Sequence, residues 1–152
     1  MSTCFFIGSH TARDFLAPLL DQAIARHITE YGVSEFVVGH YGQFDRLAAE
    51  ALCRAKVRCP GIRLRLLTPY HPFDSPIPVP AGFDDTYYPE GLEAVPKRFA
   101  IPRANRLLMD TSQFLIAYPG LGTSRELTQY ALRRQKLGKL HVELLAASSE
   151  FA

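Results

Sequence analysis

The sequence predicts an α/β fold of Rossmann-like type, with a mostly parallel sheet of about five strands covered by helices on both faces. Two patterns predict it. Short apolar runs, followed by glycine or proline turns, alternate with stretches whose apolar residues recur at helical spacing. The chain has 152 residues, of which 47% are hydrophobic and 21% charged, and this suits one globular domain over residues 1–152.

Five apolar runs fit strands of this sheet. The third run alternates its apolar residues with Arg63 and Arg65, which is typical of a strand near a sheet edge with one face in water. The other runs are short and continuous, as in strands that are buried on both faces. The expected strands cover residues 4–7, 36–38, 62–67, 114–117 and 140–145.

Four stretches between these runs have the apolar spacing of helices. Asp14 is placed to cap the first helix, and Pro102 stands at the first position of the third, where a missing N–H costs least. Gly138 ends the last helix as a residue that tolerates left-handed backbone. The expected helices cover residues 15–31, 44–57, 102–110 and 124–137.

The segment 69–89 interrupts this alternation because it contains six prolines. Loops of this length inside a compact domain are usually functional. Because prolines lack N–H donors, we expect the segment to stay out of the sheet. We also expect it to lie over or beside the glycine cleft as a lid whose tip, at 77–82, is mobile without ligand. Phe73, Phe83, Tyr87 and Tyr88 are its available anchors. The tail, residues 146–152, is expected to fray.

The composition excludes several classes of protein. The longest apolar runs span four or five residues, whereas a membrane helix needs about 20, and the N-terminus lacks the basic start of a signal peptide. A net charge of +2 disfavours nucleic acid as a partner. Cys4, Cys53 and Cys59 form no CxxC pair. We therefore expect a cytoplasmic protein without a metal, a cofactor or a membrane contact.

Three of the expected strands end in glycine turns, at residues 8–10, 39–45 and 119–126. In an open parallel sheet, ligands bind beyond the carboxyl ends of the strands. Glycine lets backbone N–H groups approach an anion, and the helix that follows adds about half a positive charge. We therefore expect a nucleotide or other phosphorylated small molecule to be bound by Gly8, Ser9, His10, Gly39, Gly42, Asp45, Gly120, Gly122 and Thr123.

The carboxylates of these turns also suit structural roles. Residues 123–126 read Thr-Ser-Arg-Glu, which fits a capping box with Thr123 as the N-cap and Glu126 at the third helical position. Asp45 can cap the second helix or contact a ribose hydroxyl.

The rings of the turns leave similar alternatives. His10 and His40 suit either a general acid or a histidine held by hydrogen bonds within a turn. Tyr41 and Phe44 can stack on a base or pack their turn onto the helix. The turns contain neither the dinucleotide fingerprint GxGxxG nor the phosphate-loop motif GxxxxGK[ST].

Residues 120–126, Gly-Leu-Gly-Thr-Ser-Arg-Glu, resemble the GxGTxxE core of the LOG ("Lonely Guy") phosphoribohydrolases. Residues 39–45 resemble the second glycine turn of the wider SLOG superfamily, which includes the DNA-processing DprA/Smf proteins. Residues 88–93 and 96–101, with Asn105 and Arg106, are similar to a small uncharacterised bacterial SLOG group. The resemblance covers residues 4–145, but Tyr118-Pro119 stands where LOG enzymes have Pro-Gly.

The resemblance implies a Rossmann-like SLOG domain and, if LOG chemistry is retained, hydrolysis of the N-glycosidic bond of nucleoside 5′-monophosphates. Glu126 would then stabilise the oxocarbenium-like transition state, and Arg106 or Arg103 would hold the phosphate. Asn105 would contact the ligand. LOG proteins form dimers through helices, which implies a homodimer through residues 102–110, although the apolar face there suits a monomer core equally well.

Three functions follow from these observations. The first is binding of a nucleotide or nucleotide-derived ligand by a sensor or regulator. The alternative is a LOG-type N-glycosidase, and a DprA-like DNA-handling module is more distant because the charge is balanced.

Overall fold

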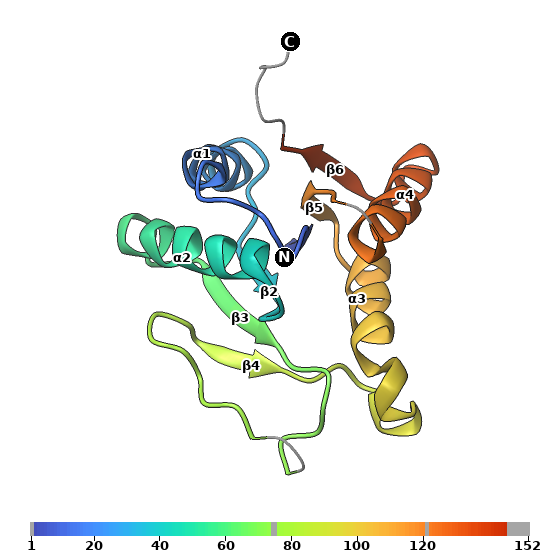
Figure 1. Ribbon diagram of the computed structural model, residues 1–152. Coiled ribbons are helices and arrows are strands. Elements are labelled where there is room, and N and C mark those ends of the chain that lie inside the picture. The colour runs from blue at the N-terminus through green and yellow to red at the C-terminus, as the bar shows by residue number, and fades with distance from the viewer. Residues whose placement is uncertain (1, 74–75, 121, 146–152) are drawn as a thin grey trace.

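The computed structural model describes residues 2–73, 76–120 and 122–145 and confirms the α/β prediction. Within them, six parallel strands form one sheet in the order β4-β3-β2-β1-β5-β6 (Figure 1). The strands are β1 Thr3–Gly8, β2 Glu35–Val38, β3 Arg63–Leu67, β4 Asp85–Tyr87, β5 Phe114–Tyr118 and β6 His141–Leu144. The helices are α1 Leu16–Thr29, α2 Gln43–Arg58, α3 Ala100–Thr111 and α4 Thr123–Lys136, with the 3₁₀ turns η1 Leu92–Ala94 and η2 Lys97–Phe99.

Helices cover both faces of the sheet, as the sequence predicts. Helices α1 and α2 lie on one face and α3 and α4 on the other (Figure 1). Because successive side chains of a strand point to opposite faces, neighbouring residues of β1 enter different cores. Phe6 packs in the cluster beneath α1 and α2, whereas Phe5 packs in the cluster beneath α3 and α4.

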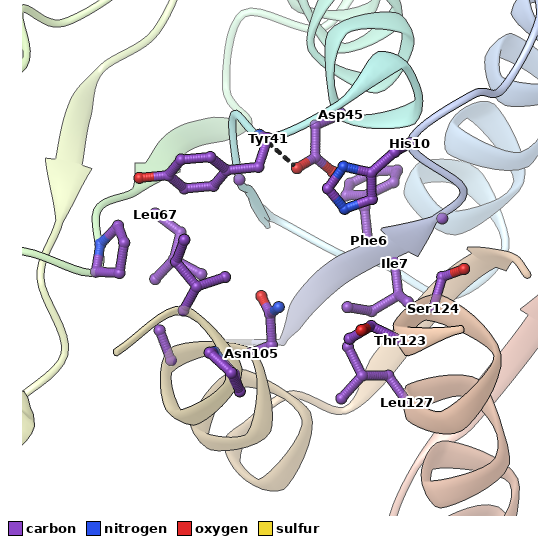
Figure 2. Close-up of a pocket in the computed structure, with 16 residues that line it drawn as sticks. Phe6, Ile7, His10, Tyr41, Asp45, Leu67, Asn105, Thr123, Ser124 and Leu127 are labelled. Carbon is purple, nitrogen blue, oxygen red and sulfur yellow. Dashed lines mark hydrogen bonds between the residues drawn. The ribbon is translucent and has the colours of Figure 1, made fainter. Parts of the chain in front are cut away.

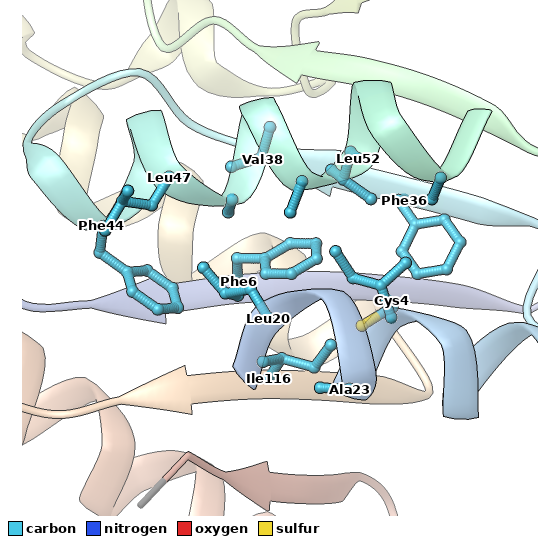
Figure 3. Packing of buried hydrophobic residues seen from close by; sticks show 14 of the residues in the cluster. Cys4, Phe6, Leu20, Ala23, Phe36, Val38, Phe44, Leu47, Leu52 and Ile116 are labelled. Atoms are coloured by element: carbon cyan, nitrogen blue, oxygen red, sulfur yellow. The ribbon is translucent and has the colours of Figure 1, made fainter. Parts of the chain in front are cut away.

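The first cluster is formed where the apolar stripes of α1 and α2 meet the sheet. Leu20 of α1 and Leu52 of α2 are fully buried beside Phe6 and Phe36 (Figure 3). In the second cluster Leu108 of α3 is buried, so this face of α3 belongs to the core of the chain itself.

The expected cap of α1 is wrong. The helix begins at Leu16, and no side chain caps it. The carbonyl groups of Arg13 and Asp14 accept the N–H groups of Leu16 and Ala17 instead, within a turn that precedes the helix. The carboxylate of Asp14 lies 3.3 Å from the guanidinium of Arg46.

The expectation that the segment 69–89 stays out of the sheet is also wrong. Residues 85–87 form β4, which pairs in parallel with β3 from Arg65 to Leu67. The prolines stop at Pro80 and resume at Pro89, so every residue between them keeps the N–H that a strand needs. The sheet therefore has one more strand than the five expected.

The two ends of this segment, at Pro69 to His71 and at Tyr88, lie beside the expected cleft, whereas its middle part packs elsewhere. A parallel neighbour of β3 must start at the opposite edge of the sheet, so the segment runs back along β3 to reach it. Gly82 lies against the Cys53 side chain of α2, and the carboxylate of Asp84 accepts the Leu64 N–H at 2.8 Å. Phe83 packs on the first cluster, whereas Phe73 is 91% exposed and anchors nothing in the core. The expected fraying of 146–152 falls outside the described residues.

The strand order places the reversal of the chain between β1 and β5. Strands β2, β3 and β4 follow on one side of β1, and β5 and β6 on the other. The crevice at the carboxyl ends of such neighbouring strands is the usual ligand site of open α/β sheets. None of the helices in the described ranges is long and apolar enough to span a bilayer.

Candidate functional site

A cavity of about 260 Å³, here called the main cavity, lies at the carboxyl ends of β1, β2 and β3. Its walls come from the turns after β1 and β2 and from the first residues of α3 and α4 (Figure 2). Leu67, Leu127 and Ile7 supply apolar lining. The polar side chains that line it are His10, Tyr41, Asp45, Asn105, Thr123 and Ser124.

Two of the predicted glycines, Gly8 and Gly39, lie at this edge of the sheet, where close packing leaves no room for a side chain. A Cβ at Gly8 would lie 2.1 Å from the ring of Phe44, and one at Gly39 would lie 2.9 Å from the Asp45 carboxylate. Gly8 and Gly39 line the main cavity directly. Phe44 is buried and packs its turn onto the helix, which decides between the two roles left open for this ring.

The other predicted glycines hold the neighbouring turns together. Gly42 has φ of 112° and lies against His10, where a Cβ would come within 2.9 Å. A Cβ on Gly120 would lie 2.7 Å from the Ser9 hydroxyl. Gly122 has φ of 73° and directly precedes Thr123, which lines the cavity.

Two helix N-termini reach this region, and they differ in their hydrogen bonds. The first N–H groups of α2, from Gln43 and Phe44, donate to the carbonyls of His10 and Ser9 at 3.0 and 3.3 Å. In the described part of the chain, the N–H groups of Thr123 and Ser124, which begin α4, meet no acceptor. Because Thr123 and Ser124 line the main cavity, the positive end of α4 borders it.

The capping box expected at α4 is wrong. Gly122 occupies the N-cap position, so Thr123 is the first helical residue and Glu126 the fourth. The hydroxyl of Ser124 instead accepts the N–H of Gly120 at 3.0 Å and ties the turn to the helix. The sequence analysis did not predict a role for Ser124, which is buried in the structure. A serine just after a glycine turn, at the start of a helix, is the sequence feature that could have indicated it.

Asp45 is the carboxylate of the main cavity. Its Oδ2 accepts the N–H of Tyr41 at 3.0 Å, so the side chain closes the second glycine turn and does not cap α2 (Figure 2). Burial raises the pKa of Asp45 to about 6, and the hydrogen bond from Tyr41 opposes that rise. No Lys or Arg is among the described residues that line the cavity.

The rings of the second turn pack on one another. The centroids of His40 and Tyr41 are 4.2 Å apart. Burial lowers the pKa of His40, and a backbone hydrogen bond with Leu67 opposes this effect. Burial also raises the pKa of Tyr41, and the phenol of Tyr70 adds to the rise. Tyr41 lines the cavity, whereas His40 does not.

Several predicted residues do not line the main cavity. Ser9, Gly42, Gly120 and Gly122 belong to the turns beside it and are not among its lining residues. Glu126, Arg103 and Arg106 are exposed and do not line it. The guanidinium of Arg106 lies 3.9 Å from the ring centroid of Tyr130 on α4. Asn105, the residue before Arg106, does line the cavity because its side of α3 faces the sheet.

In comparisons with known proteins, no protein-family model and no curated protein matches the sequence. The described residues contain no cluster of three His, Cys, Asp or Glu side chains that could hold a metal ion.

Proposed function

We propose that the protein binds a phosphorylated small molecule of the nucleotide class in the main cavity and acts as a sensor or regulator. One observation carries the proposal. The N-terminus of α4 and the half-buried carboxylate of Asp45 reach the same cavity from different sides, at the chain reversal between β1 and β5 (Figure 2). A ligand with an anionic end and a hydroxyl-bearing end complements both.

The anionic end suits the N-terminus of α4. Thr123 and Ser124 line this part of the cavity, and their backbone N–H groups and the Thr123 hydroxyl can donate hydrogen bonds. The helix adds about half a positive charge there. His10, on the turn after β1, supplies a further ring nitrogen at the cavity.

The hydroxyl-bearing end suits Asp45 and Asn105. A carboxylate and an amide oxygen accept hydrogen bonds from sugar hydroxyls, and the amide nitrogen donates one. A phosphate directly beside Asp45 would be repelled once that group ionises. The two ends of the cavity therefore favour one orientation, with the phosphate at α4 and the sugar at α2.

The geometry favours binding over N-glycoside hydrolysis. LOG-type chemistry assigns the reacting carboxylate to Glu126, which is exposed and outside the cavity. Asp45 does reach the cavity, but the N–H of Tyr41 already occupies one of its oxygens. We therefore place ligand recognition first, and the test below includes a readout for released base.

The test places a negative charge where the phosphate would bind. Thr123→Glu adds a carboxylate at the first position of α4, which favours the helix and should keep the fold intact. We expect the wild-type protein to bind ribose 5-phosphate in calorimetry and Thr123→Glu to bind it at least tenfold more weakly. The neutral variant Thr123→Gln is the matched control and should stay within about threefold of wild type.

Two results would contradict the proposal. One is a wild-type protein that binds neither ribose 5-phosphate nor a nucleoside 5′-monophosphate at millimolar concentration. The other is equal affinity of Thr123→Glu and Thr123→Gln. Release of free base from the monophosphate, followed by chromatography, would replace the sensor role with hydrolysis.

A further inference from the structure

A second cavity, of about 190 Å³, adjoins the main one. It lies between the residues that follow β3, the residues that follow β4, and the turns η1 and η2. Its distinctive side chains are Tyr70, His71, Tyr88, Leu92, Glu93 and Lys97.

The walls of the second cavity are aromatic. The rings of His71 and Tyr88 meet edge to face with centroids 5.4 Å apart, and the ring of Phe73 stacks on His71 at a centroid distance of 5.4 Å. Leu92, which is buried in the second cluster, adds apolar lining. Flat rings with an apolar neighbour suit another flat ring as ligand.

Two charged side chains complete this cavity. Glu93 and Lys97 are exposed, and both line it. Their carboxylate and ammonium groups can accept and donate hydrogen bonds at the edge of a heterocycle. The second cavity thus offers both a stacking surface and groups that pair with a polar ring edge.

The two cavities adjoin one another at three places. Pro69 lines both of them, and the consecutive residues Ala100 and Ile101 line one each. Tyr41 of the main cavity and Tyr70 of the second lie near enough for their phenols to interact electrostatically. A ligand that enters one cavity can therefore extend into the other.

The volumes support a shared ligand. Sites for small molecules and cofactors typically measure about 300–1,000 Å³. The main cavity, at about 260 Å³, and the second, at about 190 Å³, each fall below that range. Together they fall within it.

We propose that the two cavities form one elongated site, in which the second cavity holds the base of a nucleotide against Tyr70, His71 and Tyr88. This inference rests on the proposed function, because the sugar phosphate then occupies the main cavity. It assigns recognition of the base to residues after β3 and β4, and recognition of the phosphate to α4.

The experiment separates the base from the sugar phosphate. Adenosine 5′-monophosphate and ribose 5-phosphate are titrated by calorimetry into the wild type and into Tyr70→Ala and His71→Ala. Loss of a stacking ring weakens binding by about 5- to 150-fold. We expect each variant to bind the nucleotide at least tenfold more weakly and ribose 5-phosphate within about twofold of wild type.

Matched controls come from the opposite edge of the sheet. Tyr31→Ala and His141→Ala remove the same two residue types from an aromatic cluster at the amino ends of β5 and β6. They should leave both affinities unchanged, and circular dichroism reports whether each variant is folded.

The outcomes distinguish the two proposals. Equal wild-type affinity for the nucleotide and for ribose 5-phosphate would overturn the base site and leave the sugar-phosphate site standing. Unchanged nucleotide affinity in both Tyr70→Ala and His71→Ala would do the same. If the wild type binds neither the nucleotide nor ribose 5-phosphate, both proposals are overturned.

Discussion

The two edges of the sheet contain similar residue types, yet one edge is closed and the other is hollow. At the amino ends of the strands, the ring of Tyr31 stacks on Phe114 with centroids 5.3 Å apart, and His27 and His141 meet both of these rings edge to face. At the carboxyl ends, Tyr41, Tyr70 and His71 stand around two cavities.

The difference comes from the residues at the strand ends. Strands β5 and β6 begin with Phe114 and His141, whose rings fill the amino edge. Strand β1 ends with Gly8 and β2 is followed by Gly39, so backbone lies where those rings would be. The turns of the carboxyl edge therefore depend on glycines whose Cβ atoms would collide with Phe44 or Asp45, and an added side chain should disrupt this packing.

The largest effect is expected from Gly8→Ala. The new Cβ would lie 2.1 Å from the ring of Phe44, which is itself buried. We expect the free energy of unfolding to fall by about 3 kcal/mol, near the upper end for an overpacked core, as measured by urea denaturation. Gly61→Ala, whose Cβ would have open space around it, is the control and should change stability by less than about 0.5 kcal/mol. Equal stability of the two variants would refute the close approach.

An intermediate effect is expected from Asp45→Asn at the carboxyl edge. Burial raises the pKa of Asp45 to about 6, so the ionised carboxylate destabilises the fold above that pH. Asn keeps an oxygen for the Tyr41 N–H and carries no charge. We expect the variant to be more stable than wild type by about 1–2 kcal/mol at pH 7.5. The gain should vanish as the pH falls from 6 towards 4, and a less stable variant at pH 7.5 would contradict it.

A smaller effect of opposite sign is expected from His27 at the amino edge. Burial lowers the pKa of His27, while Glu143 opposes that shift and His141 and Arg26 add to it. Its Nδ1 lies 2.7 Å from the carbonyl of Ala23, and its Nε2 is buried without a partner among the described residues.

Below pH 6.5 the unfolded chain therefore binds a proton at His27 more readily than the folded protein does. The free energy of unfolding falls as a result. We expect the wild type to lose about 1 kcal/mol more than His27→Leu between pH 7 and pH 5.5. Urea denaturation at both pH values measures this difference. Parallel pH profiles of the two proteins would contradict a lowered pKa of His27 in the folded protein.

The strands were predictable because burial on both faces forces apolar runs, as in residues 114–117. Strand β4 was not, since Asp85, Thr86 and Tyr87 are half-buried and polar, and proline-rich segments flank them. What brings β4 to the sheet is long-range: the Asp85 carboxylate bonds to Arg63 and Arg65 at 2.7 and 2.9 Å. Such pairs are visible only once the strands are aligned.

The candidate site was predictable in part for a similar reason. Glycines after strands indicate where backbone approaches backbone, so Gly8 and Gly39 could be placed at one edge from the sequence. The side of α3 that faces the cavity could not. Asn105 and Arg106 are neighbours in the sequence, and only the packing of α3 decides that the amide faces the cavity while the guanidinium lies on Tyr130.

Strand β4 also sets how long one wall of the second cavity persists. It pairs with β3 over three residues and, within the described ranges, stands at the edge of the sheet without a second neighbouring strand. Short edge strands open by local fluctuation before the centre of a sheet does, so the amides of 85–87 should exchange with deuterium earliest in the sheet. Tyr88 follows this strand directly, and each such opening releases the residue that carries the ring. The wall that contains Tyr88 should therefore open on the timescale of local unfolding, whereas Leu92, which is buried in the second cluster, holds its part of the wall in place.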